Sequence, residues 1–70
     1  METMQMTEYT IEEKITGYVF ATAMSVEFLK EGRTEYTING KPVDMDEFTE
    51  WLRGYYEMPH EVTSIKCWQA

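Results

Sequence analysis

The chain is poor in cysteine and in long apolar runs, and both absences restrict where it can work. Cys67 is its single cysteine, so no disulfide can form within the 70 residues, whereas secreted domains of this size usually need several. No apolar run approaches the roughly 20 residues that cross a bilayer, and the first six residues are neither basic nor apolar enough for a signal peptide. We therefore expect a protein of the reducing cytoplasm.

Positive charge is also scarce. The chain has thirteen acidic residues and only six basic ones, which gives a formal net charge of −7. The basic residues occur singly along the chain instead of in the cluster that binds nucleic acid. An excess of this sign repels nucleic acid and anionic membranes, so we expect neither as a direct partner. The expected partner is a protein with a basic surface.

Residues that could support catalysis or bind a metal are few. His60 is the only histidine, and it follows Pro59 in an expected loop, far in sequence from a third group that could orient a pair with Cys67. We expect Cys67 to be a small buried residue. Three potential metal ligands lie close together in sequence: Glu57, His60 and Glu61. They lie on either side of a proline, whereas a metal site needs ligands held on a fixed scaffold. The sequence predicts no enzyme, no metal site and no cofactor.

The length of the chain allows one domain with a thin core. The composition is 43% hydrophobic and 14% aromatic, which is far from the signature of disorder. We expect a flexible tail over residues 1–8 and a single folded domain over residues 9–70.

Alternation of apolar and polar residues predicts strands in the middle and at the end of that domain. Residues 24–30 and 34–38 alternate and are expected to form a β-hairpin with one apolar face. Asn39-Gly40 is a strong turn signal, because both residues tolerate positive φ. Residues 61–68 are rich in β-branched side chains and favour a final strand. Residues 10–23 fit both a helix and a strand, and the aromatic and β-branched content favours the strand.

A helix is expected between the turn and the last strand. Asp44 and Glu47 form a capping-box pattern in front of an apolar periodic run. The run consists of Met45, Phe48, Leu52 and Tyr55, widened by Trp51 and Tyr56, and it should pack on the sheet. The predicted fold class is therefore α+β, a small antiparallel sheet with one main helix packed on it, in the order βββαβ, or αββαβ if residues 10–23 are helical.

The same helix carries the densest negative charge. Asp44, Asp46, Glu47 and Glu50 lie within roughly 10 Å of helix, a spacing that approaches the one charge per ~1.7 Å of duplex DNA. Tyr and Trp are enriched at interface hot spots, although a small sheet also needs them as core. The candidate partner-binding residues are Asp44, Asp46, Glu47, Glu50, Trp51, Tyr55, Tyr56 and Glu57.

In type, the chain resembles the short acidic proteins of phages and mobile elements that block host machinery or defence, including anti-restriction and anti-CRISPR inhibitors. The run Glu50-Trp51, Tyr55, Pro59, Glu61-Val62-Thr63 and Cys67 is similar to a small phage inhibitor of bacterial RNA polymerase over the last third of the chain. Ser64 and Lys66 stand where that resemblance implies an arginine-rich strand. The resemblance implies a phage origin and a place of action in the cytoplasm of a bacterial host.

Two functions follow as hypotheses. The first is an inhibitor that occupies a basic nucleic-acid-binding surface of a host protein, such as a nucleic-acid enzyme, by partial DNA mimicry. The second is a structural or homo-oligomerising module, in which aromatic residues and an exposed strand edge drive self-association into, for example, a homodimer.

Overall fold

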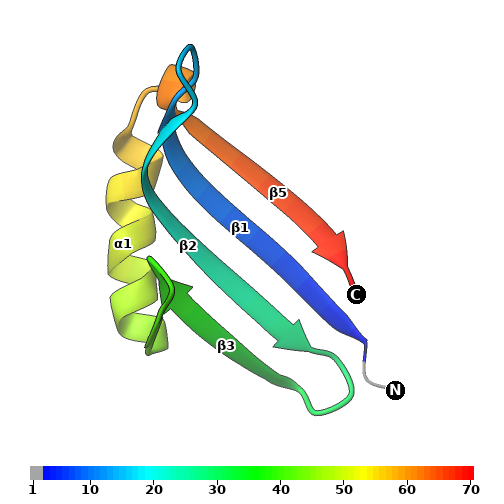
Figure 1. Ribbon diagram of the computed structural model, residues 1–70. Helices are drawn as coiled ribbons and strands as arrows, with labels where there is room; N and C mark the ends of the chain where they lie inside the picture. The colour runs from blue at the N-terminus through cyan, green and yellow to red at the C-terminus, as the bar shows by residue number, and fades with distance from the viewer. Residues whose placement is uncertain (1–2) are drawn as a thin grey trace.

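Five antiparallel strands form one sheet, and a single α-helix lies across one face of it (Figure 1). This architecture comes from a computed structural model that describes residues 3–70. The elements are β1 (Met4–Glu13), β2 (Tyr18–Phe28), β3 (Arg33–Ile38), β4 (Lys41–Val43), α1 (Met45–Glu57), the 3-10 turn η1 (His60–Val62) and β5 (Thr63–Gln69). The predicted α+β class with one main helix on an antiparallel sheet is confirmed.

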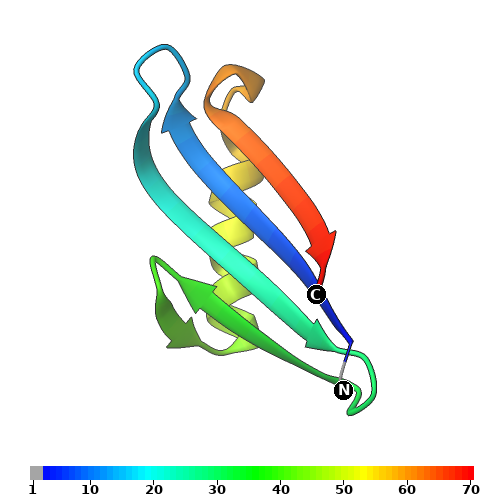
Figure 2. The ribbon, with the colours of Figure 1, turned by 45° about the vertical axis from the view of Figure 1, so that its right-hand side comes forward.

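The order of strands across the sheet is β4-β3-β2-β1-β5, so β5, the last strand in the chain, lies at an edge beside β1, the first (Figure 2). Tyr9 of β1 is opposite Ala23 of β2 on one side and Ile65 of β5 on the other. The expectation of a flexible tail over residues 1–8 is therefore wrong for Met4–Glu8, which belong to β1. Residues 1–2 of that tail lie outside the described part of the chain.

The ambiguous segment 10–23 contains no helix, and it is not one strand either. It forms the end of β1, a tight turn and the start of β2, with a register shift between Ile11 and Glu12. The turn depends on Gly17, whose φ of 78° lies in the left-handed region that suits a residue without a Cβ. Residues 18–23 and the predicted 24–30 strand belong to the same strand, β2, so this hairpin adds no strand to the predicted βββαβ order; the additional strand of the observed ββββαβ order is β4.

The local signals around the helix are confirmed. Asn39 and Gly40 have φ angles of 52° and 81°, as the predicted turn requires. Asp44 caps α1, because its side chain accepts a hydrogen bond of 2.8 Å from the main-chain N–H of Glu47. Two boundaries differ from the prediction: residues 41–43 form the short β4, and β5 begins at Thr63 because η1 occupies residues 60–62.

The core lies between α1 and the face of the sheet that carries Tyr9, Ala23 and Tyr36. Phe48 and Tyr55 of α1 are each only 4% exposed. The ring of Tyr9 packs edge-on against both of them, with centroid distances of 5.9 and 5.4 Å. Aromatic pairs in this geometry add stability beyond their buried area, so a few rings hold the helix on the sheet.

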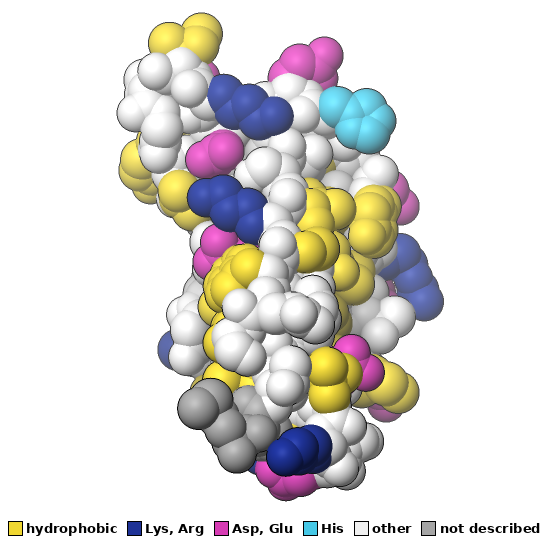
Figure 3. Space-filling view, turned by 90° about the vertical axis from the view of Figure 1, so that its right-hand side faces the viewer, with side chains coloured by type: hydrophobic (Ala, Val, Ile, Leu, Met, Phe, Trp, Pro, Cys, Tyr) yellow, Lys and Arg dark blue, Asp and Glu magenta, His cyan; other side chains and the backbone are white. Residues whose placement is uncertain are grey.

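The apolar face predicted for the 24–30 strand is turned away from the helix. Side chains alternate between faces, and Ala23 and Ser25 share the helix side with Tyr9, so Met24, Val26 and Phe28 lie on the other side. The register adds Met4, Met6 and Trp68 to that side. Hydrophobic side chains are gathered along the middle of this open face, which no helix covers (Figure 3).

Candidate protein-binding surface

The solvent side of α1 carries most of the predicted site. Asp46, Glu50, Arg53 and Glu57 are spaced i, i+4, i+7 and i+11, which places them on one side of an α-helix. All four are exposed, and they lie opposite the buried Phe48. Glu47 is exposed as well and lies at the flank of this row. We call Asp46, Glu47, Glu50 and Glu57 the acidic helix face.

Little positive charge offsets this face. Arg53 is the single basic residue of α1, and it forms an ion pair of 3.2 Å with Glu50. Both side chains are more than two-thirds exposed, so the pair is screened by water and contributes little to stability. Within residues 3–70, no ion pair involves Asp46, Glu47 or Glu57. The outward side of the helix therefore keeps a net negative charge.

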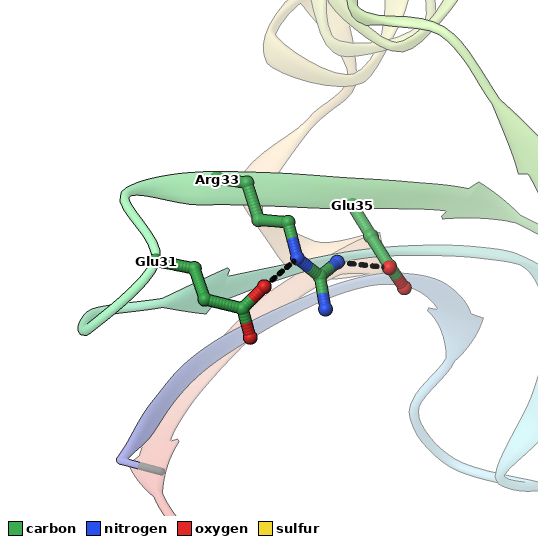
Figure 4. A network of polar contacts seen from close by, with 3 residues as sticks. All are labelled: Glu31, Arg33 and Glu35. Atoms are coloured by element: carbon green, nitrogen blue, oxygen red, sulfur yellow. Dashed lines mark hydrogen bonds and ion pairs between the residues drawn. The ribbon is translucent and has the colours of Figure 1, made fainter.

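The acids at the start of β3 and in the turn before it are arranged differently. Arg33 lies between Glu31 and Glu35 and binds both carboxylates, the first at 2.8 Å (Figure 4). Its guanidinium also lies over the ring of Phe28, 3.8 Å from the ring centre. Hydrogen bonds to Glu31 and then Glu35 raise the pKa of Arg33. This network balances part of the negative charge locally. On α1, four acids against Arg53 leave a net charge of −3 out of the −7 of the chain.

Asp44 differs from the other acids of the predicted site. Its carboxylate holds the N–H of Glu47 at the start of α1, which satisfies one of the free donors of the first turn. Its position next to Met45 places it at the rim of a shallow hollow of about 430 Å³ between β3, β4 and the start of the helix. We therefore assign Asp44 first to the helix cap.

The three aromatic residues of the predicted site are exposed to very different degrees. Tyr55 is buried, and its hydroxyl donates a hydrogen bond of 2.9 Å to the main-chain carbonyl of Ser64. Burial raises the pKa of this hydroxyl. Trp51 is half-buried and stacks on Tyr55 at 5.6 Å, whereas Tyr56 is 64% exposed and meets Tyr55 edge-on. Tyr55 therefore belongs to the core, whereas the ring of Tyr56 is accessible to solvent.

A small groove of about 90 Å³ lies beside Tyr56, between the end of α1 and β5. Its walls include Met58, which is 39% exposed, and Ile65, which is 49% exposed. The structure thus joins an apolar groove to the C-terminal end of the acidic helix face, where Glu57 lies. Ile65 had no place in the predicted site, because only the pairing of β5 with β1 brings it beside the helix.

Other exposed apolar residues lie where the sequence alone offered no signal. Ile15 is 95% exposed in the turn between β1 and β2, and Tyr18 and Phe20 are each 62% exposed and pack edge-on at 4.8 Å. Cys67, expected to be buried, is exposed on β5. The exposure of Cys67 could not be predicted from the alternation of residues, because an edge strand and a central strand share the same alternation.

Comparisons with protein-family models, curated proteins and solved structures found no match to this chain. Across residues 3–70 there is no group of three His, Cys, Asp or Glu side chains that could hold a metal ion. In the same part of the chain no helix is long and apolar enough to span a membrane.

Proposed function

We propose that this protein is a small acidic inhibitor that acts by binding, and that it occupies a basic, nucleic-acid-binding surface of another protein. The observation that carries the proposal is the acidic helix face, where the only cation, Arg53, already pairs with Glu50. A group of carboxylates attracts a protein surface that binds phosphates, because carboxylates and phosphates both carry closely spaced negative charge. The proposed partner is a nucleic-acid enzyme of a bacterial host. The protein would then act as phage inhibitors do, either against a host defence system or in taking over host machinery.

The dimensions of the helix support partial DNA mimicry. Asp46 and Glu57 are eleven positions apart on α1, which corresponds to roughly 17 Å along the helix axis. Tyr56 stands exposed beside the row and supplies an aromatic anchor of the kind enriched at hot spots. Charge would steer the encounter, and the ring would hold the complex.

The test is capture of bacterial proteins on the tagged chain at low salt, followed by elution with duplex DNA and mass spectrometry. The matched pair of variants is Glu50→Lys with Glu57→Lys on the helix, and Glu27→Lys with Glu61→Lys away from the row. Both pairs change the net charge equally, and all four positions are exposed. We expect the helix pair to abolish capture and the control pair to retain most of it.

One result supports the proposal: a nucleic-acid-binding protein that DNA releases and that the helix pair fails to capture. Equal capture by both charge-reversed pairs would show that α1 is not the contact surface. Capture that resists both salt and DNA would show that charge does not drive the binding.

The second candidate, a homo-oligomerising module, is favoured by the open face of the sheet and by the position of β5 at its edge. Self-association through the sheet leaves α1 exposed, so the two functions are compatible in one molecule.

A further inference from the structure

The outer edge of β5 presents unpaired main-chain groups. Met4 and Ala70 exchange both main-chain hydrogen bonds, at 3.3 and 3.0 Å. Along an antiparallel strand, residues whose main-chain N–H and C=O groups point toward the paired strand alternate with residues whose groups point away from it. The N–H and C=O groups of Ile65, Cys67 and Gln69 therefore point away from β1, and among residues 3–70 β5 has no other neighbour in the sheet.

This edge has little of the protection that proteins usually give to free strands. Edges are commonly blunted by prolines, bulges, charges or very short strands. β5 is 7 residues long, contains no proline, and pairs with β1 in a continuous register. Its one charged residue is Lys66, which lies opposite Glu8 of β1. The opposite edge is β4, which has only 3 residues and includes Pro42.

The side chains of β5 suit pairing with a second copy in one register. If Cys67 lies opposite Cys67 of the second copy, each Lys66 is opposite Trp68 of the other chain, on the open face. Trp68 is 40% exposed, so its ring is accessible to a cation. The register centred on Lys66 instead places two like charges directly opposite each other, which is destabilising.

The charges near this centre are balanced. Lys66 has Glu8 beside it, and the acidic helix face lies on another layer of the molecule. Glu61, the nearest acid in sequence to β5, is six positions from Cys67, or roughly 20 Å along an extended strand. The net charge of −7 still repels the second copy over long distances, and salt screens that repulsion.

We propose that β5 is a homodimer interface, in which the β5 edges of two copies pair antiparallel about Cys67. The five-stranded sheets become one continuous sheet, joined by about six main-chain hydrogen bonds. The two-fold axis is perpendicular to the sheet, so both copies of α1 lie on the same side. The inference rests on the second candidate function, self-association, and not on the proposed inhibition. Such a dimer would place two acidic helix faces on one surface.

The first experiment measures the mass of the full chain by light scattering across concentration and salt, together with crosslinking of Cys67 by a short bismaleimide. We expect a dimer that strengthens as salt rises, and a crosslinked product of twice the chain mass. This salt dependence is opposite to that expected for the acidic helix face, so the two proposals fail independently.

Three variants test the edge itself. Ile65→Pro removes an outward N–H that β1 does not use, and a proline at such a position is tolerated on an edge strand. Lys66→Glu removes the two Lys66–Trp68 contacts of the proposed dimer, one in each direction, and should weaken dimerisation about tenfold or more. Lys41→Glu makes the same charge change on β4 and is the matched control, expected to dimerise normally.

Circular dichroism shows whether Ile65→Pro and Lys66→Glu fold, because Lys66→Glu also places a second acid opposite Glu8 of β1. If either variant loses the fold, Lys66→Gln, which removes the cation without adding an acid, decides the question. Monomeric Lys66→Glu beside a dimeric Lys41→Glu supports the interface. A wild-type chain that stays monomeric at high salt overturns it. So does a dimer that Lys66→Glu leaves unchanged, because such a dimer must use another surface, such as the open face.

Discussion

The hydroxyl of Tyr55 and the main-chain carbonyl of Ser64 are joined by a hydrogen bond of 2.9 Å, which connects α1 to β5. The two residues are only nine positions apart, yet they belong to different layers of the fold. Because β5 has a sheet neighbour on one side only, this bond is an additional attachment of the edge strand to the core.

Tyr55→Phe removes that hydrogen bond and keeps the buried ring. We expect a loss of about 1 kcal/mol in the free energy of unfolding, the usual size for one such bond. Urea denaturation followed by circular dichroism measures it. Tyr18→Phe is the control, because Tyr18 is 62% exposed and keeps its ring contact with Phe20. Equal effects of the two substitutions would argue against a structural role for the Tyr55 hydroxyl.

Asp44→Ala removes the acceptor that caps α1. Loss of an N-cap side chain typically costs about 1 kcal/mol of stability, and we expect that decrease in thermal or urea unfolding. Asp44→Asn retains a capping oxygen and should recover most of the loss, although it removes the same negative charge. If Asn is as destabilising as Ala, the charge and not the hydrogen bond is what matters at this position.

Replacing two of the glycines by alanine should change the stability of the protein in opposite directions. Gly54 lies inside α1, and nothing is within 4 Å of the position where a Cβ would be, so Gly54→Ala should stabilise the protein by up to about 1 kcal/mol. Gly40 has a φ of 81°, which an L side chain adopts at a cost, so Gly40→Ala should destabilise it. Melting temperatures of the two variants should therefore lie on either side of the wild-type value.

The hydrogen bonds of Glu13 should make the stability of the protein depend on pH. A hydrogen bond with the Thr16 side chain, and then bonds from the N–H groups of Ile15 and Thr16, lower the pKa of Glu13 below its ordinary 4.5. The folded state therefore favours the carboxylate form of Glu13. The stability that this carboxylate contributes is present above the pKa of Glu13 in the unfolded chain, and it is lost as pH falls through the pKa of Glu13 in the folded state. Glu13→Gln should be less stable than wild type at neutral pH, and the difference should shrink in acid. Urea midpoints at several pH values measure this. A constant difference would contradict the assignment.

The signals that predicted the fold correctly are local ones. Asn39-Gly40 specifies its turn through backbone geometry, and Asp44 specifies the start of α1 through a bond to a residue three positions away. The periodic run that contains Phe48 and Tyr55 marks the buried side of the helix, and both residues are buried. Each signal depends only on neighbours within a turn or two, so it can be read without the rest of the structure.

The signals that misled are those whose meaning depends on distant partners. The alternation of Met24, Val26 and Phe28 correctly indicates a strand, but it cannot say which face the helix will cover. That choice depends on Tyr9 and Tyr36, whose rings meet Phe48 of α1 from two different strands. For the same reason Met4–Glu8 could be taken for a tail, because their partners lie in β2 and β5.

Composition and short-range patterns were enough to predict the class of the fold, the position and cap of its helix, and the large excess of negative charge. These properties are set by composition and by bonds between near neighbours. The folded structure was needed to show that Tyr55 is core while Tyr56 is surface, that Cys67 is exposed, and that β5 has a free edge. Burial and strand pairing arise from contacts between residues far apart in the chain, such as Thr7 with Cys67, and no local pattern encodes such contacts.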